Sequence, residues 1–76
     1  MPKLPAIKIA KLLKTLLKLG FVKHHQSGSH LQLKHVDGRR VTIPMHLGKD
    51  IKKGTLNGII KDINLTKDDF IRALKQ

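Results

Sequence analysis

Hydrophobic residues near the start of the chain recur at the spacing of one face of a helix. The positions i, i+3, i+4 and i+7 of this stretch are occupied by Ile9, Leu12, Leu13 and Leu16. Because lysines fall on the opposite side, the pattern predicts an amphipathic helix over residues 6–19, with Pro5 at its first turn. Ile7 lies off the apolar stripe and is expected to be partly exposed. Gly20 is expected to end the helix, since glycine readily adopts the left-handed conformation that follows a last turn.

Alternation of hydrophobic and polar residues follows, which is typical of strands with one buried face. We expect three strands, over residues 21–26, 31–36 and 39–45. In the second strand, Leu31 and Leu33 fall on one face. The polar His30, Gln32 and Lys34 fall on the other face, with His30 at the mouth of the strand.

Turn residues separate the three predicted strands. Residues 27–29 are small and polar and are expected to connect the first two strands. Asp37–Gly38 is a favoured two-residue hairpin turn and is expected to connect the second strand to the third. Pro44 has no N–H group to donate to a ladder, so it marks the end or the edge of the third strand.

Helical spacing returns after a polar loop over residues 46–53. The apolar residues of this second helix are Leu56, Ile59, Ile60 and Ile63. Thr66, with Asp69 three residues later, resembles a capping box and predicts a short final helix. The order is therefore α-β-β-β-α plus a short C-terminal helix, an α+β fold in which helices cover one face of a three-stranded antiparallel sheet. A single domain is expected over residues 1–76, because a chain of this length has room for one core.

The face of the sheet that no helix covers is predicted to be polar and basic. Its residues are His30, Gln32, Lys34, Arg40 and Thr42. The whole chain carries 16 Lys and Arg against five acidic residues, a net charge of +11. An excess of this size favours a polyanionic partner over a merely solubilising surface, because ordinary surfaces mix both signs.

Composition narrows the remaining classes of protein. The chain has no cysteine, which excludes disulfides and thiolate chemistry. No run of 18 apolar residues is present, and lysines interrupt the first apolar stretch. We therefore expect neither a membrane span nor a signal peptide. The first helix has no Trp or Phe to anchor it on a membrane surface, which disfavours that alternative.

The five histidines form no recognisable metal site in the sequence, and we expect neither a metal nor another cofactor. His24 and His25 are adjacent, so on a regular strand they point to opposite faces. The other three histidines have no carboxylate or thiolate partner at ligand spacing. Ser27 and Ser29 lie in a predicted turn without the pattern of a nucleophile elbow, which disfavours a serine hydrolase.

Three functions remain compatible with a basic sheet face. The first is RNA binding alone, through shape and phosphate contacts, as in double-stranded RNA-binding modules. The second is RNA cleavage with the ribose 2′-OH as internal nucleophile, which needs only proton transfer and cations near the developing charge. His30 qualifies for the proton transfer because the unperturbed pKa of histidine lies near neutrality. The third is the docking of an acidic protein partner without any RNA.

Six short motifs occur in a fixed order along the chain. They are Leu-Gly-Phe at 19–21, Gly-Ser-His at 28–30, Asp-Gly-Arg-Arg at 37–40, Ile-Pro-Met-His at 43–46, Lys-Gly-Thr-Leu at 53–56 and Ile-Ile-Lys at 59–61. Together they resemble the HicA family, the small mRNA-cleaving toxins of toxin–antitoxin pairs, from Leu16 to Phe70. The resemblance implies a fold like the double-stranded RNA-binding domain and metal-independent, ribosome-independent cleavage of mRNA. It also implies a HicB antitoxin that binds the toxin and shields its active histidine.

The resemblance implies that His30, in Gly-Ser-His, is the catalytic residue. We expect it to act as general acid/base, and His46, before the second helix, is the runner-up. Gly28 is expected to supply a backbone conformation that other residues resist. Ser29 is expected either to orient the imidazole or a phosphate, or to stabilise the turn. The candidate RNA phosphate contacts are Lys23, Lys34, Arg39 and Arg40. The family often has an arginine at the position of His25, so this chain departs from the pattern at one substrate contact.

Overall fold

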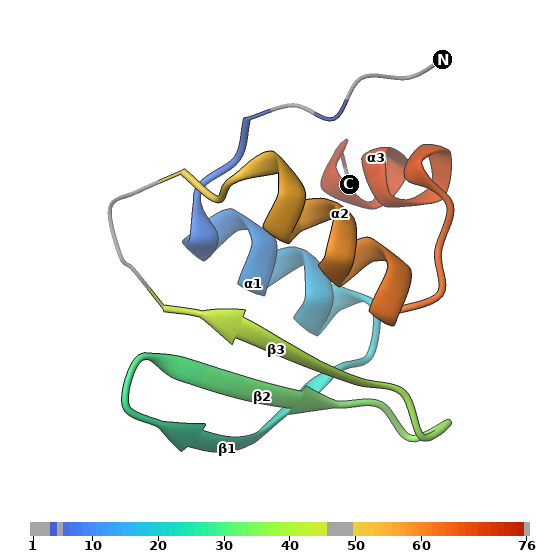
Figure 1. The fold of residues 1–76 in the computed structure, drawn as a ribbon. Coiled ribbons are helices and arrows are strands. Elements are labelled where there is room, and N and C mark those ends of the chain that lie inside the picture. The colour runs from blue at the N-terminus through green and yellow to red at the C-terminus, as the bar shows by residue number, and fades with distance from the viewer. Residues whose placement is uncertain (1–3, 5, 46–49, 76) are drawn as a thin grey trace.

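The computed structural model describes residues 4, 6–45 and 50–75, so Pro5 and His46 lie outside the described residues. Within these ranges the order of elements is α1-β1-β2-β3-α2-α3. Their bounds are Ile9–Lys18 (α1), Val22–Ser27 (β1), His30–Lys34 (β2), Arg40–Pro44 (β3), Lys53–Asp62 (α2) and Lys67–Lys75 (α3) (Figure 1). This order confirms the predicted α+β layout, including the short C-terminal helix.

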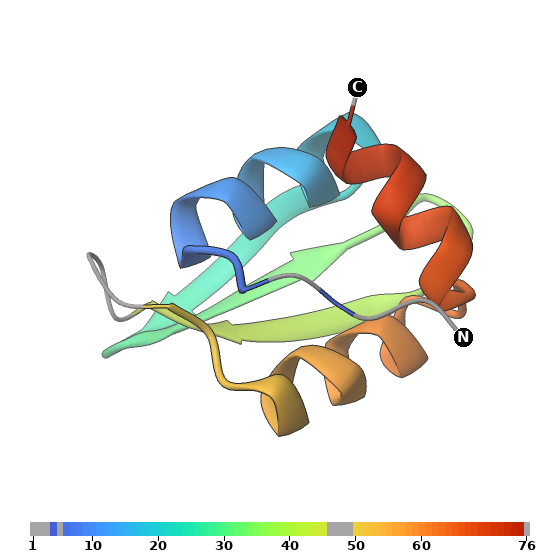
Figure 2. The same cartoon turned by 90° about the horizontal axis from the view of Figure 1, so that it is seen from above.

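The three strands form one antiparallel sheet in the order β1-β2-β3, with β2 in the middle. All three helices lie on the same side of this sheet (Figures 1 and 2). Leu31 and Leu33 of β2, and Val41 and Ile43 of β3, are buried, whereas the residues between them are exposed. The alternation predicted for the second and third strands is therefore confirmed.

Strand β1 differs from its neighbours because every one of its residues is exposed. It pairs with β2 along one edge, and no strand formed by the described residues lies along its other edge. The core consequently rests on β2 and β3, and β1 extends beyond it.

Side chains of the helices fill the space over β2 and β3. The largest fully buried hydrophobic side chains are Phe21, Phe70, Leu12, Leu16, Leu33, Ile43, Leu56 and Ile63. Thr15 is the single buried polar residue in the described part of the chain. Its Oγ1 donates a hydrogen bond to the carbonyl of Lys11 at 2.9 Å. The buried hydroxyl is therefore satisfied within its own helix.

The start of the chain differs from the prediction. Helix α1 begins at Ile9 rather than at Ala6, because the preceding Lys8 is extended (ψ 153°) and forms a β-bridge with the segment before α2. The N–H of Ile51 donates a hydrogen bond to the carbonyl of Ile7 at 2.9 Å. This pairing turns Ile7 inward, where its exposure is only 8%. The expectation that Ile7 is partly exposed was therefore wrong.

Gly20 ends α1 as predicted, with a φ of +99°. The N–H of Phe21 donates to the carbonyl of Leu16 at 3.1 Å and closes the last turn. A β-carbon on Gly20 would lie 2.8 Å from Nε2 of His35. Both the backbone conformation and the available space therefore require glycine at this position.

The connection from α2 to α3 reverses at Asn64, whose φ is +59°. Asparagine is one of the few residues other than glycine that visit this region routinely. The N–H of Asp69 donates to Oγ1 of Thr66 at 3.1 Å, which confirms the predicted cap of the last helix.

Candidate functional site

The residues of the sheet that point away from the helices form three rows across the strands. We call these nine residues the open face. From the β1–β2 turn outward, the rows are Ser27–His30–Pro44, His25–Gln32–Thr42 and Val22–Lys34–Arg40. Directly paired residues of antiparallel strands share a face, and successive rows are two residues apart, about 6.6–6.8 Å. The structure thus gathers the five residues that the sequence predicted for this face.

His30 lies at the first position of β2, directly after a two-residue turn. Gly28 of this turn has a φ of +58°, while nothing within 4 Å would touch a β-carbon there. A side chain at this position would therefore strain the backbone without any steric clash. The carbonyl of Ser29 accepts a hydrogen bond from the N–H of Met45 at 2.5 Å, which ties the turn to the end of β3. The backbone at His30 is therefore fixed by β1 on one side and by β3 on the other.

The imidazole of His30 is exposed. No hydrogen bond or ion pair joins it to any other residue that the structure describes. Its partners in the row are Ser27 on one side and Pro44 on the other. Both ring nitrogens are therefore available to a ligand that lies on the open face.

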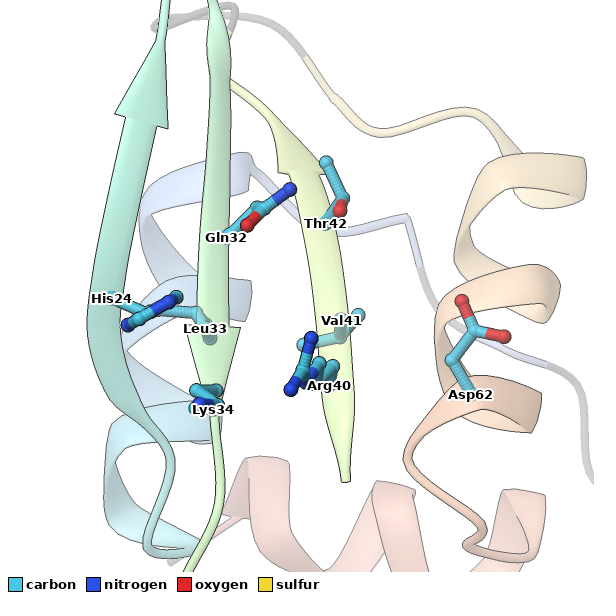
Figure 3. Close-up of a pocket in the computed structure, with 8 residues that line it drawn as sticks. All are labelled: His24, Gln32, Leu33, Lys34, Arg40, Val41, Thr42 and Asp62. Atoms are coloured by element: carbon cyan, nitrogen blue, oxygen red, sulfur yellow. The ribbon is translucent and has the colours of Figure 1, made fainter. Parts of the chain in front are cut away.

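A β-bulge in β1 changes the direction of two further histidines. Lys23 pairs with Leu33 and His25 pairs with Gln32, so the register shifts by one residue at His24. His25 consequently shares the open face with Gln32, and His24 lines a hollow on the same face (Figure 3). The expectation that His24 and His25 point to opposite faces was wrong, because it assumed a regular strand.

The hollow lies at the end of the open face farthest from His30 and has a volume of about 220 Å³. It is lined by His24, Gln32, Leu33, Lys34, Arg40, Val41, Thr42 and Asp62. Figure 3 shows the side chains of Lys34 and Arg40 next to each other on β2 and β3, with Asp62 beyond the edge of β3 on α2. No ion pair joins Asp62 to either cation, all three being described residues.

Lys34 and Arg40 are directly opposite each other in the β2–β3 ladder. Like charges at directly opposed positions destabilise a sheet. Neither side chain has an acidic partner among the described residues. The pair therefore brings two positive charges to a hollow whose described lining has one carboxylate, that of Asp62, and this net positive site favours an anionic ligand.

Lys23, the third candidate phosphate contact, does not join this group. It pairs with Leu33, whose side chain is buried under the helices, so Lys23 points to the helix side of the sheet. It is nevertheless exposed, since β1 extends beyond the core.

Arg39, the fourth candidate, is engaged elsewhere. Its Nε donates to Oδ2 of Asp37 at 2.7 Å, and its Nη1 donates to the carbonyl of Ile63 at 2.5 Å. Its guanidinium also lies over the ring of Phe21, 5.1 Å from the centroid. Arg39 thus connects the β2–β3 turn to the end of α2 and lies apart from the open face.

His35 belongs to the same structural cluster as Arg39. Its ring packs edge-on against Phe21, with centroids 5.0 Å apart. Its Nε2 lies 3.1 Å from the carbonyl of Leu19, and its Nδ1 lies 3.0 Å from Oδ1 of Asp37. The backbone N–H of Arg39 donates to Oδ1 of Asp37, and together with the Arg39 guanidinium it holds the pKa of this carboxyl below its usual 3.8.

No group of three or more His, Cys, Asp or Glu side chains within residues 4, 6–45 and 50–75 is arranged to hold a metal ion. In the same ranges, no helix has both the length and the apolar character needed to cross a membrane. His46, the runner-up catalytic residue, lies outside the described residues.

Comparison with known proteins identifies the class of protein to which this chain belongs. The model of the family described as the HicA toxin of bacterial toxin-antitoxin matches residues 9–65. The match runs from the first residue of α1 through the three strands and α2, and it leaves α3 outside. The chain is therefore a toxin of a bacterial toxin–antitoxin pair. Since the match covers most of its length, the chain belongs to the HicA family. No curated protein matches it.

Proposed function

We propose that this toxin is a metal-independent endoribonuclease that cleaves mRNA in the cytoplasm, with His30 as general acid/base. The observation that carries the proposal is the exposed imidazole of His30, which has no partner among the described residues, on a basic sheet face. Cleavage by the 2′-OH of the RNA itself requires no nucleophile from the protein. It requires a group that exchanges protons near neutral pH, which histidine supplies.

The cations of the open face support the same proposal. Lys34 lies two rows from His30, about 13 Å along β2, and pairs with Arg40. We propose that these two residues bind an RNA phosphate beyond the cleaved bond and hold the strand across the open face. Lys23 and Arg39 are left out of this role, because one points to the helix side and the other is bonded to Asp37 and Ile63.

The partner that follows from a toxin–antitoxin pair is a neutralising protein. With a net charge of +11, the toxin favours an acidic surface. We propose a HicB-like antitoxin that covers the open face and thereby excludes RNA from His30.

The test compares the wild type with His30→Gln, using the purified full-length chain and RNA in the presence of EDTA. We expect the cleavage rate under single-turnover conditions to fall by about 10²–10⁴-fold, the usual contribution of general acid–base catalysis. His24→Gln is the matched control, because it removes an imidazole from the same face without touching the row of His30. Its rate at saturating enzyme should stay within about twofold of the wild type.

Expression of the same variants in a bacterial host gives an independent result. The wild type should arrest growth and deplete mRNA, and His30→Gln should do neither. Equal arrest by both proteins would contradict the role of His30. RNA binding with no cleavage by the wild type would instead indicate a non-catalytic RNA-binding module.

A further inference from the structure

His25 lies on the open face because of the bulge in β1. Strict alternation from Lys23, which points to the helix side, would place His25 on the helix side as well. The one-residue shift at His24 reverses this and pairs His25 with Gln32 in the middle row. Bulges often occur at positions where a side chain must be re-aimed next to a functional site.

The bulge makes His25 and His30 diagonal neighbours. His30 precedes Gln32 by two residues on β2, and Gln32 is the direct partner of His25. Diagonal neighbours on one face of an antiparallel pair are about 7–8 Å apart, within reach of long or aromatic side chains. Both histidines are exposed, and neither imidazole forms a hydrogen bond or ion pair with a described residue. The two rings can therefore approach one ligand from two sides.

A phosphodiester that is cut by its own 2′-OH needs two proton transfers, one at the attacking oxygen and one at the leaving oxygen. The bond between the 2′-oxygen and phosphorus forms while the bond between phosphorus and the 5′-oxygen breaks. One group must remove the proton of the 2′-OH, and another must donate a proton to the departing 5′-oxygen. Each group must lie within about 2.6–3.2 Å of its own oxygen, on opposite sides of the phosphorus.

We propose that His25 is a second catalytic residue, which exchanges one of these two protons while His30 exchanges the other. This proposal rests on the proposed function. In the reactive state one imidazole is neutral and the other is protonated. After the step their protonation states are exchanged, and the products are a 2′,3′-cyclic phosphate and a 5′-hydroxyl. Proton exchange with solvent then returns each imidazole to its starting protonation state.

The first experiment measures the single-turnover rate against pH, with an RNA oligonucleotide whose cleavage site has been mapped with the wild type. Two imidazoles in opposite protonation states give a bell-shaped profile. We expect His25→Gln to lower the rate by at least about 10²-fold and to abolish one limb of the bell. His24→Gln, which changes the neighbouring histidine of the same strand, should keep both limbs.

A second variant tests whether His25 is needed for proton exchange or only for its positive charge. His25→Arg retains a cation that can bind phosphate, but arginine does not release its proton in proteins. We expect this variant to bind RNA as tightly as the wild type and to be as slow as His25→Gln. All variants should fold normally, because His24, His25 and His30 are exposed and substitutions at exposed surface positions usually change stability little.

A substrate with sulfur in place of the 5′-bridging oxygen then assigns the two roles. A thiolate leaves without needing a proton, so the variant that lacks the general acid should cleave this substrate at nearly the wild-type rate. The variant that lacks the general base should remain slow. If neither His25→Gln nor His30→Gln is rescued, the two residues do not divide the protons between them and the proposal fails.

The outcomes for this proposal and for the proposed function are distinct. If His30→Gln is inactive and His25→Gln retains its rate and both limbs, His30 is catalytic and His25 is not. If His25→Gln changes only the KM, His25 is a binding contact and the proposal is overturned. If the wild type does not cleave RNA, the proposed function fails, and the role of His25 fails with it.

Discussion

Lys34 and Arg40 face each other directly across β2 and β3 on the open side of the sheet. Two cations in this arrangement repel each other, and no acidic residue described in the structure forms an ion pair with either of them. The fold tolerates this repulsion because the hydrophobic core stabilises the protein by more than the repulsion destabilises it. The presence of the pair is explained if the two cations share an anionic ligand.

The first prediction follows from this pair. Lys34→Gln should raise the free energy of unfolding by about 0.2–1 kcal/mol, because it removes the like-charge contact. The same variant should weaken RNA binding and reduce the slope of log K against log salt by about 0.7, as expected for one lost phosphate contact to a single strand. Thermal melts and binding titrations between low and moderate salt measure both effects.

The control for this prediction is Lys14→Gln, on the exposed side of α1. It changes the net charge equally but leaves the open face intact. Both quantities should stay close to the wild type. A Lys34→Gln variant that is less stable, or that keeps the full salt slope, would contradict the interpretation of the pair.

The second prediction concerns Arg39. Arg39→Gln removes the hydrogen bond to the carbonyl of Ile63 and the contact with the ring of Phe21. We expect the free energy of unfolding to fall by about 1–2 kcal/mol, the combined size of such contacts. Chemical denaturation of the full-length chain measures this loss. RNA affinity of the folded variant should be unchanged. A large drop in affinity without a loss of stability would contradict the structural role and would indicate that Arg39 contacts RNA.

The third prediction compares two glycines. Gly20→Ala should destabilise the protein by at least about 1–2 kcal/mol, because alanine resists a φ of +99° and its β-carbon would meet the ring of His35. Gly58→Ala is the matched control. Gly58 lies inside α2, and a β-carbon added there would have no neighbour within 4 Å, so alanine should stabilise the helix by about 0.5–1 kcal/mol. Equal effects of the two changes would show that the end of α1 is less constrained than the structure indicates.

The fourth prediction is a dependence of stability on pH. The backbone N–H and the guanidinium of Arg39 lower the pKa of Asp37 below 3.8 in the folded protein. A carboxyl with a lowered folded pKa contributes stability above its unfolded pKa, and this contribution disappears as the pH falls through its folded pKa. Wild type and Asp37→Asn should therefore differ in stability at about pH 6 and converge only below about pH 3.8. A constant difference down to about pH 2 would contradict this assignment.

Much of the fold could be predicted from the sequence because the helices and two of the strands have regular periodicity. Leu31, Leu33, Val41 and Ile43 alternate with polar residues, and this pattern alone determines which face of β2 and β3 is buried. Gly20 and Thr66 mark helix ends by local chemistry, and both act as predicted. The face that carries His30 follows directly from the same alternation.

The rest depends on contacts between distant parts of the chain. Ile7 is buried because the segment before α2 pairs with it, and no local pattern contains that information. The bulge at His24 inserts one residue into a ladder that looks continuous in the sequence, so the prediction that His24 and His25 point to opposite faces was wrong. Arg39 and Arg40 are adjacent basic residues in the sequence, and the contacts of Arg39 with Phe21 and Ile63, both distant along the chain, give it a structural role that its neighbour lacks.

The open face is divided between strands of unequal stability. His30 is on β2, at the edge of the core, whereas His25 is on β1, which buries no side chain and is bonded along one edge. Such a strand can detach locally at a free energy well below that of global unfolding. Warming would then separate the two histidines while the helices remain folded, so RNA cleavage that needs both imidazoles, as proposed above, would be lost reversibly below the melting temperature of the protein.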